Sequence, residues 1–152
     1  MPIEIISGLY LGNKVDAYNI KFLTSRNIKT IINVTNEVPF LKNLNIECIR
    51  ISITDKFAEN ESEKNNREYY FQLLQLCKLI DHKLSKNYNI LVHCKHGKYR
   101  STALIIAYLM YKTNMKLEEI YDILITKYPL VKMRKHIFLE ALKMFEKDML
   151  EI

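Results

Sequence analysis

Residues 89–111 read NILVHCKHGKYRSTALIIAYLMY. The first five form a short apolar segment typical of a buried strand, and the apolar residues from Ser101 to Tyr111 predict a buried helix. Between them lies a polar loop that contains Gly97, one of three glycines in the chain. A strand, loop and helix in this order can turn successive backbone N–H groups inward below a helix N-terminus. The loop is therefore predicted to bind an oxyanion such as phosphate.

The side chains of this loop indicate covalent chemistry. Inward-pointing amides, the helix N-terminus and Arg100 all favour the thiolate form of Cys94, which makes Cys94 the predicted nucleophile. Arg100 lies six positions further on, so the loop can bring its guanidinium back to bind two phosphate oxygens, a geometry that lysine does not reproduce. Ser101 is predicted to donate a hydrogen bond to the sulfur when the sulfur leaves. His93 is predicted to orient the loop through its ring nitrogens.

The cysteines could also have other roles. Most free cysteines are buried apolar residues, but the charged and polar neighbours of Cys94 argue against such a position. Cys48 and Cys77 lie in an alternating strand and an amphipathic helix, so each is predicted to pack in the core. His93, Cys94 and His96 could ligate a metal, but the other histidines and cysteines form no second pair of donors. Neither a metal nor another cofactor is expected.

Patterns elsewhere in the chain predict alternating strands and helices. Strands are predicted over 4–6, 9–11, 29–34, 46–53 and 89–93, and helices over 14–27, 69–84, 101–111, 117–127 and 135–150. The polar segment from Asp55 to Arg67 is predicted to be an exposed, functional loop. This order predicts an α/β fold in one domain, residues 1–152, with a central, mostly parallel sheet of about five strands flanked by about six helices.

Composition narrows the class of protein. A chain of 152 residues, 49% hydrophobic and 26% charged, fits one globular domain with one core. The net charge of +6 is spread along the chain, so no stable nucleic-acid complex is expected. Three cysteines without CxxC spacing favour a reducing compartment. The longest apolar run is too short to cross a membrane and the first residues do not resemble a signal peptide. We expect a cytoplasmic monomer, with a nuclear location also open.

The pattern HCxxGxxRS at residues 93–101 resembles the signature of the cysteine-dependent protein tyrosine and dual-specificity phosphatases. The resemblance extends to GLYLG at residues 8–12, to the strand from Lys29 to Thr35 and to AYLM at residues 107–110. It implies a compact protein-tyrosine-phosphatase-like sandwich. It also implies a dual-specificity phosphatase that hydrolyses phosphotyrosine, phosphoserine and phosphothreonine in proteins through a cysteinyl-phosphate intermediate.

The resemblance also implies a general acid. The stretch ISITD at residues 51–55 is similar to the family's segment that ends in a catalytic aspartate, so Asp55 is the candidate. It would protonate the leaving group and later activate water. The loop behind Asp55 is longer than usual in the family, which leaves Glu59, Glu61 and Glu63 as competitors.

The choice of substrate stays open between classes. The loop residues predicted to line the substrate site are Lys95, His96, Gly97, Lys98 and Tyr99. Two ammonium groups at Lys95 and Lys98 could select a polyanion, namely a phosphoinositide, an inositol pyrophosphate or an RNA 5′-triphosphate, in place of a phosphoprotein. A third alternative is a phosphate-binding scaffold without turnover, although the presence of Cys94, Arg100 and Ser101 together favours catalysis.

Overall fold

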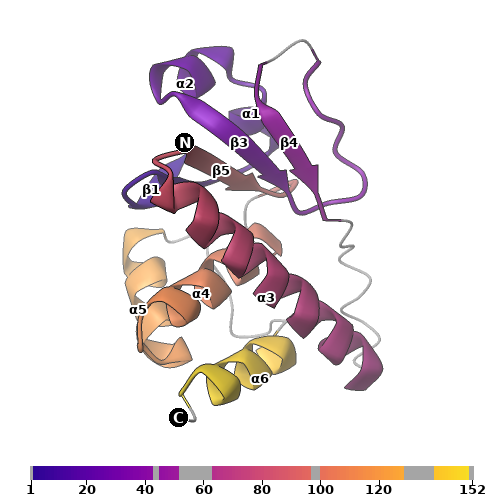
Figure 1. The fold of residues 1–152 in the computed structure, drawn as a ribbon, viewed down its shortest axis with the longest axis vertical. Helices are drawn as coiled ribbons and strands as arrows, with labels where there is room; N and C mark the ends of the chain where they lie inside the picture. Colours follow the sequence, from indigo (N-terminus) through magenta and orange to yellow (C-terminus); the bar gives the residue numbers. More distant parts are fainter. Residues whose placement is uncertain (1, 43–44, 52–62, 97–99, 129–138, 151–152) are drawn as a thin grey trace.

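The computed structural model describes residues 2–42, 45–51, 63–96, 100–128 and 139–150. In these ranges the chain forms a five-stranded sheet and six helices (Figure 1), which confirms the predicted α/β class. The strands, in their spatial order, are β1 (Ile3–Ile6), β2 (Leu9–Gly12), β5 (Asn89–His93), β3 (Ile28–Asn33) and β4 (Glu47–Arg50). β1 pairs antiparallel with β2 and every other pairing is parallel, so the sheet is mostly parallel as predicted.

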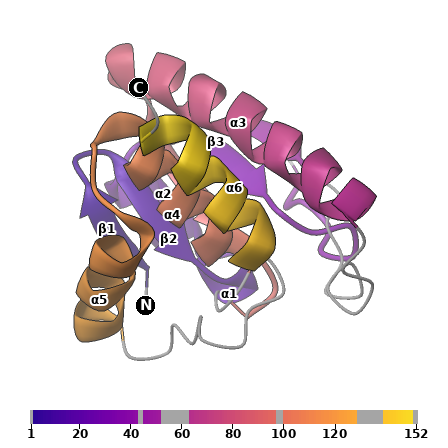
Figure 2. The ribbon, with the colours of Figure 1, turned by 90° about the horizontal axis from the view of Figure 1, so that it is seen from below.

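Both faces of the sheet are covered because the central strands are apolar on both sides, as parallel strands usually are. The helices are α1 (Lys14–Ala17), α2 (Ile20–Ser25), α3 (Glu63–Ser85), α4 (Arg100–Lys112), α5 (Leu117–Lys127) and α6 (Leu139–Leu150). Ile90 and Val92 of β5 join the core formed with α3 to α6, whereas Leu91 joins the smaller core formed with α1 and α2. Figures 1 and 2 show these two groups of helices on opposite faces.

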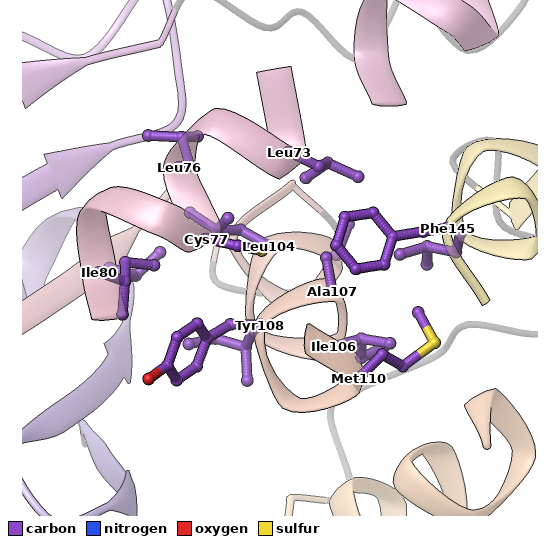
Figure 3. Close-up of a cluster of buried hydrophobic side chains, with 14 of the residues drawn as sticks. Leu73, Leu76, Cys77, Ile80, Leu104, Ile106, Ala107, Tyr108, Met110 and Phe145 are labelled. Atoms are coloured by element: carbon purple, nitrogen blue, oxygen red, sulfur yellow. The ribbon is translucent and has the colours of Figure 1, made fainter. Parts of the chain in front are cut away.

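The larger core is centred on α4, which contacts the sheet as well as α3, α5 and α6. Its buried side chains pack against those of α3 and α6 (Figure 3). Leu104, Tyr108 and Phe145 are among the buried residues of this cluster. Arg100 begins α4, so this packing fixes the end of the predicted phosphate-binding loop at which Arg100 lies.

Three predictions of local structure were wrong. The single helix predicted over 14–27 is two short helices, because Asn19 adopts an extended conformation and its side chain accepts a hydrogen bond from the Phe22 N–H, which starts α2. The predicted loop from Asp55 to Arg67 ends earlier, since α3 already begins at Glu63. Cys48 is exposed on β4, an edge strand, rather than packed in the core. Cys77 is buried, as predicted.

No helix in the described part of the chain is both long and apolar enough to cross a membrane.

Candidate active site

The carboxyl ends of four strands meet at one edge of the sheet. His93 at the end of β5 is in register with Gly12 of β2 and with Asn33 of β3, and Asn33 is in register with Arg50 of β4. The segments that follow β2, β5 and β3 therefore emerge side by side. In open α/β sheets this is the edge where ligands bind, and it is where the predicted phosphate-binding loop begins, at Cys94.

The predicted nucleophile and hydroxyl lie within hydrogen-bond distance. The Cys94 Sγ is 3.1 Å from the Ser101 Oγ, and both residues are buried. Cys94 follows the last residue of β5, while Ser101 lies in the first turn of α4. When the sulfur is a thiolate it can only accept, so the Ser101 hydroxyl is then the donor. The arrangement suits stabilisation of a sulfur anion at a helix N-terminus.

Arg100 is held by a carboxylate that the sequence analysis did not identify. Its side chain is 2% exposed, and its two terminal nitrogens donate to the carboxylate oxygens of Glu37 at 2.7 and 3.1 Å. These hydrogen bonds lower the pKa of Glu37 below its usual value. The guanidinium is thus oriented by the same fork geometry that it would use toward phosphate. Glu37 lies four residues beyond β3, which neighbours the cysteine-bearing strand, and this was the available signal.

The segment that carries Glu37 is itself fixed by hydrogen bonds. The Asn33 amide donates to the Val38 carbonyl at 2.7 Å, and the Thr35 hydroxyl donates to the Asn33 side-chain oxygen at 2.7 Å. Arg50 donates to the carbonyls of Thr35 and Val38 at 2.9 and 2.7 Å, and its guanidinium lies 4.8 Å from the centre of the Phe40 ring. Arg50 therefore closes the turn on which Glu37 is carried.

His93, predicted to orient the loop, contacts the backbone of the residue that follows it. The residue is buried, and its Nδ1 lies 3.2 Å from the Cys94 carbonyl oxygen, to which an Nδ1–H donates. Burial is the main cause of a lowered pKa for His93, because a desolvated imidazole resists protonation. The ring is therefore neutral at pH 7 and acts on the backbone of the loop.

The loop is supported on its other side by α1. The Lys14 N–H donates to the Lys95 carbonyl at 3.3 Å. Asn13 and Asp16 form a capping box at the start of α1, with side-chain to backbone distances of 2.9 and 3.0 Å. The Asp16 carboxylate is buried so close to Gly12 that a Cβ there would lie 2.7 Å from its oxygen. The spacing Asn13-x-x-Asp16 is a helix-start signal that the sequence analysis did not use.

Several predicted site residues lie outside the described ranges. These are Asp55, Gly97, Lys98 and Tyr99, together with the competing acids Glu59 and Glu61. The third competitor, Glu63, is the first residue of α3. Of the remaining predicted substrate-binding residues, Lys95 is half-buried and His96 is exposed. The assignment of the general acid and of the substrate-binding residues stays a prediction.

Within the described ranges no three histidine, cysteine, aspartate or glutamate side chains lie close enough together to hold a metal ion.

The sequence is similar to those of known phosphatases. The family model described as "Dual specificity phosphatase, catalytic domain" matches residues 9–148. The chain is 36% identical over 124 residues to human dual specificity protein phosphatase 9, covering 80% of this chain and 30% of that protein. It is 35% identical over 136 residues to human dual specificity protein phosphatase 6, covering 88% of this chain and 32% of that protein. The chain thus spans about a third of the length of these curated relatives.

Solved structures share the same fold. Human DUSP28 superimposes with a TM-score of 0.82 at 20% identity, covering 97% of this chain and 93% of that one. A leucine rich repeat and phosphatase domain containing protein from Entamoeba histolytica has a TM-score of 0.78 at 23% identity, covering 97% of this chain and 91% of the other. These likenesses confirm the predicted compact phosphatase-like fold.

Proposed function

The chain belongs to the dual specificity phosphatase family, and from this premise we propose that it hydrolyses phosphate monoesters of proteins through a cysteinyl-phosphate intermediate. The observation that carries the proposal is the cluster at the start of α4. The Cys94 sulfur lies 3.1 Å from the Ser101 hydroxyl, and Arg100, which precedes Ser101, is buried and oriented by Glu37. These are the groups that phosphoryl transfer to a thiolate requires.

In the first proposed step, the Cys94 thiolate attacks the phosphorus of the substrate. The sulfur–phosphorus bond forms as the bond from phosphorus to the substrate oxygen breaks. Arg100 and the backbone N–H groups of the loop bind the non-bridging oxygens, where the negative charge lies. The leaving oxygen takes a proton from a general acid, for which Asp55 is the candidate.

In the second step, water attacks the phosphorus of the cysteinyl phosphate. The water gives up a proton to the carboxylate of the general acid, and the sulfur–phosphorus bond breaks to release inorganic phosphate and the thiolate. A hydrogen bond from Ser101 to the departing sulfur stabilises the anion as it forms. The enzyme returns to its starting state, so no redox step or external cofactor is needed.

Proteins are the proposed substrates, because the relatives named above are protein phosphatases. The alternative of a polyanionic substrate was based on the charges of Lys95 and Lys98. None of the relatives named above has a name that indicates such a substrate. Activity on phosphotyrosine and on phosphothreonine, a monomeric state and a cytoplasmic location belong to the same proposal.

The test compares wild type with Cys94→Ser and Arg100→Lys on a small aryl phosphate and on phosphotyrosine and phosphothreonine peptides. We expect no turnover by Cys94→Ser. Arg100→Lys should lose about a hundredfold or more in kcat/KM, because lysine cannot make the bidentate contact. Circular dichroism of each variant controls for folding. Turnover that survives Cys94→Ser would refute the proposed mechanism, and phosphopeptide binding without any wild-type turnover would favour a scaffold.

A further inference from the structure

We propose that Val15, Tyr18 and Pro39, here called the shoulder, form a docking surface for an apolar residue adjacent to the phosphorylated residue of a peptide substrate. The inference rests on the proposed function and deepens it. It assigns a part of substrate selection to residues outside the phosphate-binding loop.

The shoulder combines residues of two segments that a hydrogen bond joins. Val15 and Tyr18 are three residues apart, so they lie on the same side of the helical turn of α1. Their side chains are 65% and 37% exposed. The Tyr18 hydroxyl donates to the carbonyl of Pro39 at 2.5 Å, which joins α1 to the segment after β3. Pro39 is exposed as well, so this bond brings the exposed Tyr18 to a second exposed residue.

Both ends of the shoulder are tied to the phosphate-binding loop. Lys14, which precedes Val15, donates its N–H to the Lys95 carbonyl at 3.3 Å. Pro39 lies two residues beyond Glu37, whose carboxylate binds Arg100. Val15 is therefore next in sequence to a residue that contacts the loop, and Pro39 is two residues from another. A ligand held by the loop would lie near both.

The exposure of these side chains calls for a partner. In the described ranges six large apolar side chains are exposed, and three of them lie within six consecutive residues of the chain, namely Val15, Tyr18 and Ile20. Scattered exposed apolar residues are ordinary, but a cluster beside a candidate active site indicates an interaction surface.

The depth of the site favours a peptide as the occupant. Cys94 is 2% exposed, so a phosphorylated side chain must extend inward while its backbone stays at the rim, where the neighbouring residue meets the shoulder. Lys14 is exposed and Lys95 half-buried at the same rim, which suits acidic residues elsewhere in the peptide. A phosphopeptide with one apolar neighbour and acidic flanks fits both features.

The experiment measures kcat/KM for two acidic phosphotyrosine peptides that differ only in having leucine or serine on both sides of the phosphotyrosine. Wild type, Val15→Ser and Val15→Leu are compared with the control Ile123→Ser, which removes a 43% exposed apolar side chain on α5. We expect wild type, Val15→Leu and Ile123→Ser to prefer the leucine peptide by about fivefold or more, as one desolvated apolar contact can provide. Val15→Ser should reduce this preference to below about twofold, with an unchanged rate on a small aryl phosphate.

Dissociation constants for the same peptides, measured in a Cys94→Ser background by fluorescence anisotropy, separate docking from catalysis. If wild type turns over nothing but the leucine preference in binding still depends on Val15, the proposed function fails and the shoulder stands. If Val15→Ser prefers the leucine peptide as strongly as wild type does, the proposed role of the shoulder is refuted. It is also refuted if Ile123→Ser loses as much of this preference as Val15→Ser does. Absence of any peptide preference, with faster turnover of a phosphoinositide in vesicles, overturns it in favour of a membrane substrate.

Discussion

Replacing Glu37 by glutamine tests the role of its ion pair with Arg100. Removing one partner of a buried pair typically costs about 3–5 kcal/mol, but the Glu37 side chain is 45% exposed, so water screens much of its charge. We expect a loss of about 1–2 kcal/mol in the free energy of unfolding, which corresponds to a fall of about 2–8 °C in Tm for a domain of this size. Differential scanning fluorimetry at pH 7 measures it.

The same variant should respond more strongly to oxyanions. In Glu37→Gln the charge of Arg100, 2% exposed, lacks its carboxylate, and a bound phosphate or vanadate would supply the missing negative charge. The anion-induced rise in Tm, which reports affinity by mass action, should therefore exceed that of wild type. Glu47→Gln is the control, because Glu47 is 51% exposed and pairs with Lys83 at 2.7 Å away from the loop. An unchanged Tm together with an unchanged anion response would refute the reasoning.

Four further measurements probe the other contacts. The pKa of Glu37 is lowered in the folded state. Its contribution to stability is therefore complete above the pKa of the unfolded state and is lost as pH falls through the pKa of the folded state. Urea titrations at acid pH should show this pH dependence in wild type and not in Glu37→Gln. The pKa of His93 is lowered too, so wild-type stability should also fall as pH drops below about 6.5, and His93→Asn should flatten that slope; an equal slope contradicts the assignment. Ser101→Ala should slow hydrolysis of the intermediate by about tenfold or more, seen as a burst of leaving group before a slow steady state. Arg50→Met should lose about 1–3 kcal/mol in urea unfolding and weaken phosphate binding as well; lost stability with unaltered phosphate affinity would show that Arg50 does not act through Glu37.

The contact between Cys94 and Ser101 could be predicted because it depends on residues that are close in sequence. Cys94, Arg100 and Ser101 occupy fixed positions between a strand and a helix, and the structure brings the sulfur and hydroxyl together as expected. The sheet could be predicted for the same reason, since β-branched segments indicate buried strands. The ends of helices were harder to predict from the sequence. The break at Asn19 depends on a side-chain cap that competes with continuation of the helix.

The supporting residues could not be predicted because their roles depend on register between strands distant in sequence. The position of Glu37 shortly after a predicted strand does not by itself identify Arg100 as its partner; the pairing of β3 with β5 brings the two residues together. Arg50 appears in sequence as one polar residue in a strand, and only the parallel pairing of β4 with β3 directs it to the turn after Asn33. Cys48 was misplaced because alternation identifies a strand without showing whether it lies at an edge.

The strand order has a consequence for how the protein is made. β5 lies between β2 and β3, although it leaves the ribosome long after both. Until then, β2 and β3 each present an unpaired edge, the kind of surface that promotes association with other nascent chains. Closing the gap requires contacts between distant parts of the chain, which slow folding. The segment that fills the gap ends next to Cys94, so the pairing that covers both edges also sets the position of the predicted nucleophile.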